Sequence, residues 1–178
     1  GIDTDNDRVG SIQARRSYIT DVPDKDLQKA LGSKKFIAST SFGLLDDADV
    51  IIICVPTPLK LRYQPDISFV VNAVNSIAAH MKKGCLIILE STTYPGTTEE
   101  VILPIFTKKG FKHGRDFYLC FSPERIDPGN KQFPVHKITK IVGGVNKEAA
   151  LMAQHLYNAF ILKAVAVSSV KVAETAKL

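Results

Sequence analysis

Two carboxylates and a guanidinium gather in one short loop of this sequence. The segment Ser122–Asn130 reads SPERIDPGN and places Glu124, Arg125 and Asp127 between prolines and a glycine. An Arg side chain offers a planar fork that suits phosphate or carboxylate, and a carboxylate beside a reacting carbon can order or deprotonate a water molecule. An internal Glu–Arg pair on a surface loop explains the same residues equally well, so the loop by itself leaves both interpretations open.

Two further loops carry hydroxyl side chains directly after apolar runs. Prolines on both sides of Thr57 hold its hydroxyl in a rigid loop, which suits contact with a nicotinamide or a ribose, although a proline-stiffened turn is an equal alternative. The segment Glu90–Thr98, ESTTYPGTT, places five Ser and Thr hydroxyls at the start of an expected helix, where free N–H groups attract anions. Helix capping needs only one or two of these hydroxyls, so we expect this segment to contribute to an active site.

The two ends of the sequence hold an acidic and a basic candidate. Gly1–Asp3 reads as the end of a strand, and in dinucleotide folds the acidic residue at the end of the second strand binds the adenosine ribose. Taken alone, an Asp at the end of a strand is more often a helix cap or turn residue. No Gly-rich phosphate loop is present, so a ribose-binding Asp3 requires that loop to lie upstream of residue 1. Lys177 follows Glu174 by three positions on the last helical segment, a spacing that usually gives an ordinary surface ion pair.

The elements that must position these residues alternate between short β-branched runs and longer stretches of helical period. Helical periodicity covers Ile67–Lys82, Asp5 is a plausible cap for a helix over Asn6–Arg15, and Thr97 begins a helix with a Thr and a Glu as its capping pair. A last helix begins near Ser168 or Ser169 and has no stop signal before the sequence ends. The predicted strands are Phe36–Ser39, Val50–Val55, Cys85–Leu89, Tyr118–Phe121, Lys140–Val142 and Ala164–Val167.

This alternation predicts an α/β fold with a Rossmann-like, doubly wound and mostly parallel sheet. We expect residues 1–167 to form that domain, incomplete at its N-terminus, and residues 168–178 to begin a following helical region. The candidate loops follow strands, and ligands of open α/β sheets bind outside the carboxyl ends of the strands. Both ends fall within an expected element, so the sequence predicts a piece of a larger protein.

Composition places few further limits. The 178 residues suffice for one sizeable core, and no run approaches the roughly 18 apolar residues of a membrane span, so we expect a soluble protein. The cysteines Cys54, Cys85 and Cys120 lie in or beside apolar runs without paired spacing, which predicts buried reduced thiols and a cytoplasmic protein. The histidines show no ligand spacing, so no metal site is expected. The net charge of +5 is spread along the chain without interleaved aromatic residues, which argues against nucleic acid.

The succession GIDTD, CVPTPL, ESTTYPGTTEE, SPERIDPGN and AETAKL, in this order and spacing, resembles the UDP-glucose/GDP-mannose dehydrogenase family over Gly1–Leu178. The three central motifs look most similar to the branch that acts on UDP-N-acetylhexosamines. The resemblance implies that NAD binds to a Rossmann domain and that the C6 hydroxyl of a UDP-sugar is oxidised twice, through an aldehyde, to a uronic acid for polysaccharide precursors. It also implies a homodimer formed through a central helical region.

The resemblance assigns the cofactor contacts residue by residue. By position, Asp3 matches the acidic residue on the adenosine ribose, and Arg8 matches a basic residue near the same ribose. Thr57 and Thr92 match hydroxyls near the cofactor, and Thr92 also lies close to the reacting centre of the family.

It assigns the substrate side in the same way. Glu124 matches the carboxylate that assists proton transfer or places a water molecule, and Arg125 and Ile126 match substrate-contacting positions. Lys177 matches the lysine that stabilises negative charge on the C6 oxygen of the substrate.

Some expected residues are absent from the sequence. Relatives that act on UDP-glucose carry a second glutamate where this sequence has Pro128, which favours the N-acetylhexosamine branch. The Gly-rich turn, an Asn one helical turn after Lys177 and the nucleophilic Cys all fall outside the sequence, so we expect it to be inactive alone. The alternatives are a UDP-glucose or GDP-mannose 6-dehydrogenase, a hydroxyacid dehydrogenase of the 6-phosphogluconate type, and a non-catalytic nucleotide-binding Rossmann module.

Overall fold

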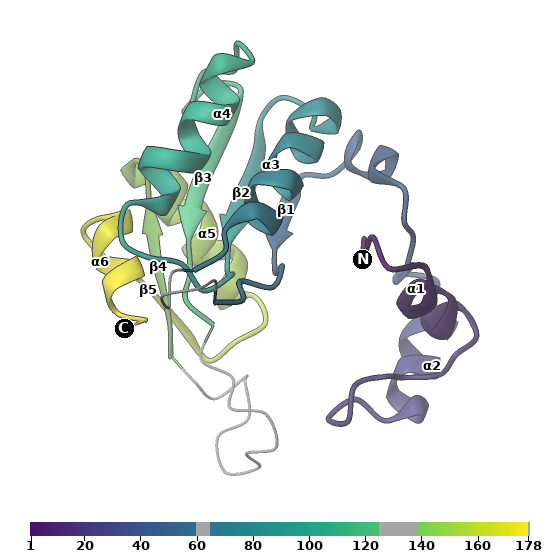
Figure 1. The fold of residues 1–178 in the computed structure, drawn as a ribbon. Coiled ribbons are helices and arrows are strands. Elements are labelled where there is room, and N and C mark those ends of the chain that lie inside the picture. The colour runs from purple at the N-terminus through teal and green to yellow at the C-terminus, as the bar shows by residue number, and fades with distance from the viewer. Residues whose placement is uncertain (60–64, 125–138, 178) are drawn as a thin grey trace. The chain divides into compact units, whose positions relative to one another are not determined.

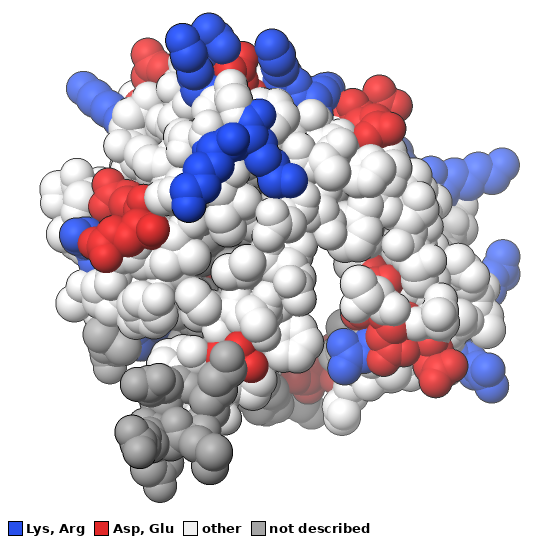
Figure 2. Space-filling view, turned by 45° about the horizontal axis from the view of Figure 1, so that its top comes forward, with Lys and Arg blue, Asp and Glu red and all other residues white. Residues whose placement is uncertain are grey.

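The computed structural model describes residues 1–59, 65–124 and 139–177, and the chain divides into two compact units, Gly1–Leu44 and Leu45–Leu178 (Figure 1). Within the described residues, no helix has both the length and the apolar character needed to cross a membrane. Figure 2 shows Lys and Arg side chains interspersed with Asp and Glu on the face in view, as expected from the spread of charge along the sequence.

The first unit contains two helices and one short parallel contact. The helix α1 (Asn6–Gln13) is capped by Asp5, whose carboxylate accepts hydrogen bonds from the backbone N–H groups of Asp7 and Arg8, so the predicted cap is confirmed. The helix α2 (Asp24–Gly32) was not predicted. The strand predicted over Phe36–Ser39 is wrong, because this segment forms an isolated parallel bridge, Ile2 with Ser39, and not a strand, although hydrogen bonds join it to the first residues of the chain.

The second unit is built on a five-stranded sheet with the strand order β1-β2-β3-β4-β5. The first three strands are parallel, β4 runs antiparallel to β3, and β5 is parallel to β4. This arrangement confirms the mostly parallel sheet. The predicted strands of this unit are found, Cys85–Leu89 with the predicted bounds and the others with ends shifted by one or two residues. The strands are β1 (Val50–Ile53), β2 (Cys85–Leu89), β3 (Phe117–Phe121), β4 (Thr139–Gly144) and β5 (Lys163–Ala166).

Helices cover both faces of this sheet (Figure 1). All five residues of β2 are buried, as expected for a parallel strand covered on both sides. Leu86 and Ile88 pack in one cluster with Ala153 and Tyr157 of α5, while α3 and α4 lie over the opposite face. The helical elements are η1 (Phe42–Leu45), α3 (Ser68–His80), η3 (Thr97–Ile102), α4 (Leu103–Lys108), α5 (Lys147–Asn158) and α6 (Val170–Thr175).

Two backbone features position η3, α4 and α6 beside the site that is described in the next subsection. The turn η3 is π-helical, and Pro104 at the start of α4 has no N–H to donate to the carbonyl of Glu100, so an α-helical bond is impossible there. The start of α6 approaches β4 so closely that a Cβ on Gly143 would lie 2.5 Å from the carbonyl oxygen of Ser169. Only glycine allows α6 to pack at this distance from the sheet.

His113 predicts how the stability of the chain depends on pH. Its Nε2 accepts a hydrogen bond of 3.0 Å from the N–H of Leu119, and burial lowers the pKa of the ring below its ordinary value. The unfolded chain therefore takes up a proton, near pH 6.5, that the folded ring resists, so the free energy of unfolding falls as the pH drops below about 6.5.

Urea unfolding at pH 7, 6 and 5 tests this expectation. The variant His113→Gln should lose stability less steeply over this range than the wild type, while His155→Gln, which changes an exposed ring on α5, should follow the wild type. Equal slopes for the wild type and His113→Gln would contradict the assignment.

Candidate active site at the carboxyl ends of the strands

Three polar loops meet at the carboxyl edge of the parallel strands. The backbone N–H groups of Glu90 and Ser91 donate to the carbonyl of Ile53 at the end of β1, at 2.9 and 3.2 Å. The N–H of Ser122 donates to the carbonyl of Leu89 at 2.9 Å, which joins the end of β3 to the end of β2. The structure thus brings the loop that holds Thr57 and the loops that follow β2 and β3 to one edge of the sheet.

The candidate hydroxyls of these loops differ in exposure. Thr57 is half-buried and Thr92 is exposed. Ser91 is buried, and its Oγ accepts a hydrogen bond of 2.8 Å from the N–H of Val55, so this hydroxyl joins two of the loops. Ser91 therefore has a structural role, whereas Thr92 presents its side chain to the surroundings.

The buried carboxylate of Glu174 caps the turn η3. Glu174 is 0% exposed and accepts hydrogen bonds from Gly96 N at 2.6 Å, Thr98 N at 2.9 Å and Thr98 Oγ1 at 2.7 Å. The capping pair predicted within Thr97–Glu100 is therefore wrong, and so is the expected surface pair between Glu174 and Lys177. A carboxylate of the chain itself already occupies the helix start at which an anion was expected to bind.

Lys177 contacts the loop that follows β3. It is half-buried, and its Nζ donates a hydrogen bond to the backbone carbonyl oxygen of Glu124, 53 residues earlier in the sequence. Two residues singled out in the sequence are thus neighbours in space. Arg125 and Ile126, the other two residues predicted on the substrate side, lie outside the described residues.

A network of charged and polar side chains lies behind Glu124. Lys140 of β4 places its Nζ 2.8 Å from Glu124 Oε2 and 3.0 Å from Glu90 Oε1. The hydroxyl of Tyr157 on α5 donates a hydrogen bond to Glu90 Oε1. The pKa of this phenol is raised, and burial is the main cause. Glu90 lies in the segment that was expected to contribute to the site, but for its hydroxyls and not for this carboxylate. Lys140 and Tyr157 were not predicted as site residues, although a lysine inside a predicted strand was an available signal.

The cysteines match the expectation in part. Cys85 and Cys120 are buried free thiols, but Cys54 is exposed, which corrects the prediction of a buried residue. Although the residue as a whole is exposed, its Sγ is partly buried and lies 3.5 Å from Glu90 Oε2, and the burial of the thiol together with this carboxylate raises its pKa to about 12. Cys54 therefore stays protonated, which makes it unsuitable as a nucleophile.

The acidic and basic candidates of the first unit contact each other. Asp3 Oδ1 accepts a hydrogen bond of 3.0 Å from Asp5 N, and Asp3 Oδ2 lies 3.5 Å from Arg8 NH1. The guanidinium of Arg8 also lies 5.8 Å from the centre of the Tyr18 ring. The side chains of Asp3 and Arg8 are 35% and 51% exposed, so both retain surface for a ligand.

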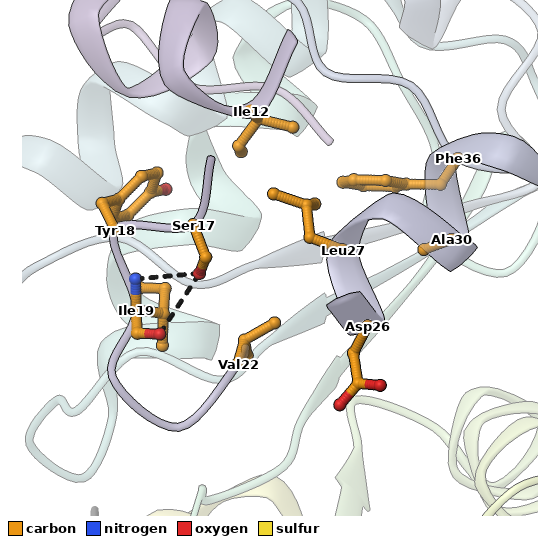
Figure 3. A pocket seen from close by; sticks show the side chains of 9 residues that line it. All are labelled: Ile12, Ser17, Tyr18, Ile19, Val22, Asp26, Leu27, Ala30 and Phe36. Atoms are coloured by element: carbon orange, nitrogen blue, oxygen red, sulfur yellow. Dashed lines mark hydrogen bonds between the residues drawn. The ribbon is translucent and has the colours of Figure 1, made fainter. Parts of the chain in front are cut away.

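A separate cavity of about 320 Å³ lies in the same unit (Figure 3). Neither Asp3 nor Arg8 lines it. The lining is largely apolar and consists of Ile12, Ser17, Tyr18, Ile19, Val22, Asp26, Leu27, Ala30 and Phe36.

A mostly parallel sheet with helices on both faces and polar loops at its carboxyl edge defines a dinucleotide-binding α/β domain. The chain belongs to the UDP-glucose/GDP-mannose dehydrogenase family, whose NAD binding domain is matched by residues 1–161. Over the whole chain it is 36% identical to a UDP-N-acetyl-D-glucosamine 6-dehydrogenase from Pseudomonas aeruginosa, and it covers 42% of that protein.

Solved structures agree with this assignment. The structure of a UDP-N-acetyl-D-mannosamine dehydrogenase from Pyrococcus horikoshii matches 99% of the chain with a TM-score of 0.92 at 32% identity, over 42% of its own length. The native structure of a UDP-N-acetyl-mannosamine dehydrogenase from Staphylococcus aureus matches the whole chain with a TM-score of 0.91 at 31% identity, over 43% of its length. The chain therefore spans less than half the length of the relatives it matches.

The cap formed by Glu174 yields a stability prediction. Glu174→Gln keeps the shape of the side chain but replaces one acceptor oxygen by an NH2 group that faces N–H donors. We expect a loss of about 1–3 kcal/mol in the free energy of unfolding, measured by urea unfolding of the chain.

The matched control is Glu100→Gln. Glu100 forms an exposed ion pair of 2.9 Å with Lys171, so its replacement should change stability by less than about 1 kcal/mol. Equal stabilities of the two variants would show that the buried cap contributes no more than the surface pair.

Proposed function

We propose that the full-length protein containing this chain is an NAD-dependent nucleotide-sugar 6-dehydrogenase that oxidises the C6 hydroxyl of a UDP-N-acetylhexosamine to the uronic acid. The observation that carries the proposal is the meeting of Lys177 and Glu124 at the carboxyl edge of a family NAD-binding domain. An ammonium beside a carboxylate-bearing loop suits a reaction in which an alcohol loses a proton and its oxygen becomes negative.

The residues present fit a bound NAD. In the proposal, the exposed part of the Asp3 carboxylate accepts hydrogen bonds from the adenosine ribose, and Arg8 lies beside the same ribose. Thr57 and Thr92 offer hydroxyls to the nicotinamide end from the loops after β1 and β2. When bound, the cofactor supplies the acceptor for the hydride that leaves C6.

The chain contributes two groups to the chemistry in this proposal. The Lys177 ammonium stabilises negative charge that develops on the C6 oxygen, and the Glu124 carboxylate accepts a proton or orders the water that completes the oxidation. The family resemblance implies a cysteine nucleophile for the second oxidation, and the proposal assigns this role to none of the three cysteines of the chain, because the pKa of Cys54 is raised and Cys85 and Cys120 are buried. Arg125 and Ile126 complete the substrate contacts.

The substrate class rests on two lines of support. The relatives named above act, by name, on UDP-N-acetyl-D-glucosamine or UDP-N-acetyl-D-mannosamine, and Pro128 stands where relatives acting on UDP-glucose carry a second glutamate. The proposal includes a cytoplasmic homodimer, in which residues 168–178, with α6, begin the central helical region. Free cysteines are in keeping with the cytoplasm.

An assay of NAD reduction at 340 nm tests the function. The full-length protein is offered UDP-N-acetylglucosamine, UDP-N-acetylmannosamine, UDP-glucose and GDP-mannose in parallel, with 6-phosphogluconate as a fifth arm. We expect reduction with one or both N-acetylhexosamines, and Lys177→Met should lower kcat by about 10²–10³-fold because charge on the C6 oxygen loses its partner.

The control is Lys82→Met, which removes a lysine that pairs with Asp49 at the surface and should keep the wild-type kcat. No reduction with either N-acetylhexosamine would overturn the substrate assignment. Binding of NAD without reduction in any arm would favour the non-catalytic nucleotide-binding module.

A further inference from the structure

Lys140 is a charged residue inside a strand of the sheet. It is the second residue of β4, and its side chain is only 11% exposed. One ammonium bridges two carboxylates, since it lies 3.0 Å from Glu90 Oε1 after β2 and 2.8 Å from Glu124 Oε2 after β3. These contacts join the ends of two strands to β4.

Glu90 is itself held from two sides. The hydroxyl of Tyr157, a residue that is 2% exposed, donates to Glu90 Oε1, and the Sγ of Cys54 lies 3.5 Å from Glu90 Oε2. The Tyr157 ring also lies 5.0 Å from Lys140 Nζ, at a distance suited to a cation–π contact. Glu90 and Lys140 therefore have little freedom to change position.

Such a network is not required for packing. Removing charged groups from water costs several kcal/mol, and an apolar side chain of similar volume in a strand often gives equal or greater stability. Lys140 is the only charged residue of β4, whose sequence is TKIVGG. A role for the positive charge of Lys140 accounts for the presence of a lysine at this position of the strand.

We propose that Lys140 is a positioning residue whose ammonium, held by Glu90 and Tyr157, fixes and keeps ionised the Glu124 carboxylate beside Lys177. This inference rests on the function proposed above, in which Glu124 handles a proton or a water molecule. Lys177 binds the backbone carbonyl of Glu124 and Lys140 binds its carboxylate, so two lysines from different elements hold the two ends of one residue.

The charges around the pair of carboxylates predict the effect of removing Lys140. The groups that contact them include Lys140 of β4, Tyr157 of α5 and Cys54 after β1. Lys177, after α6, lies at the backbone carbonyl of Glu124. Without the ammonium, Glu90 and Glu124 face each other as like charges, and a carboxylate in that setting takes up a proton more readily. Activity that needs ionised Glu124 then begins at a higher pH.

Steady-state kinetics of the full-length protein with its best UDP-sugar test the inference. Lys140→Met should lower kcat by about tenfold or more, with KM changed less than about threefold, because an interaction that acts on the chemical step is lost. The acidic limb of the kcat–pH profile should move up by about one pH unit. Lys140→Arg, which keeps the charge, should recover most of kcat and the wild-type profile.

Two further variants complete the design. Lys163→Met changes an exposed lysine on the neighbouring strand β5 and should match the wild type. Tyr157→Phe removes one hydrogen bond to Glu90 without changing charge and should shift the acidic limb in the same direction by a smaller amount. If Lys140→Met does not fold, as judged by circular dichroism, the profile of Tyr157→Phe decides the question.

The outcomes separate this inference from the function on which it rests. A wild type that is inactive with all four UDP- and GDP-sugars overturns the proposed function and, with it, this role of Lys140. An active wild type whose Lys140→Met variant keeps its kcat and its acidic limb overturns the role of Lys140 alone. A Lys140→Arg variant as impaired as a folded Lys140→Met variant also overturns it, because the charge would then not be what matters.

Discussion

The buried carboxylate of Glu174 is the interaction on which the arrangement of the site depends. Both of its oxygens accept hydrogen bonds from the start of η3, and the residues they join are as many as 78 positions apart in sequence. Left without partners, this carboxylate would carry the full cost of desolvating a charge, so the cap and the packing of α6 must form together. Lys177 follows α6, two residues after its last residue, Thr175, and its position therefore follows from the cap.

The sheet provides the second constraint. The carboxyl ends of β1, β2 and β3 lie at one edge because these strands are parallel. The antiparallel strand β4 then brings Lys140 to the same edge, where it meets the carboxylates that follow β2 and β3. Lys140 lies near the N-terminal end of β4. Because β4 is antiparallel to β3, this N-terminal end lies at the edge where a parallel strand would have its carboxyl end.

Much of the fold of the second unit follows from local patterns in the sequence. The strands β1 to β5 were predicted to within two residues because β-branched, apolar runs end at polar or Gly- and Pro-containing loops. The helix α2 was missed because its segment Asp24–Gly32 has few apolar residues. The direction of β4 and the π-helical form of η3 depend on tertiary pairing and on Pro104, which periodicity does not report.

The site residues on loops that directly follow strands were predictable from the sequence. The site residues that are positioned by contacts between distant parts of the sequence were not. Loops bearing Thr57, Thr92 and Glu124 were expected at the carboxyl edge, and the structure places them there. The partners of Glu174 lie more than 70 residues away, and its spacing to Lys177 favoured the wrong interpretation of a surface pair. The network of Lys140 joins four separate elements, which no local pattern in the sequence could connect.

Hydrogen exchange of single backbone amides, followed by NMR, tests the central role of Glu174 most directly. In the wild type, the amides of Gly96 and Thr98 should exchange slowly because both donate to a fully buried carboxylate. In Glu174→Gln, these amides and those of α6 should exchange much faster while the amides of β2 stay protected. Unchanged protection at Gly96, Thr98 and α6 in the variant would contradict the account.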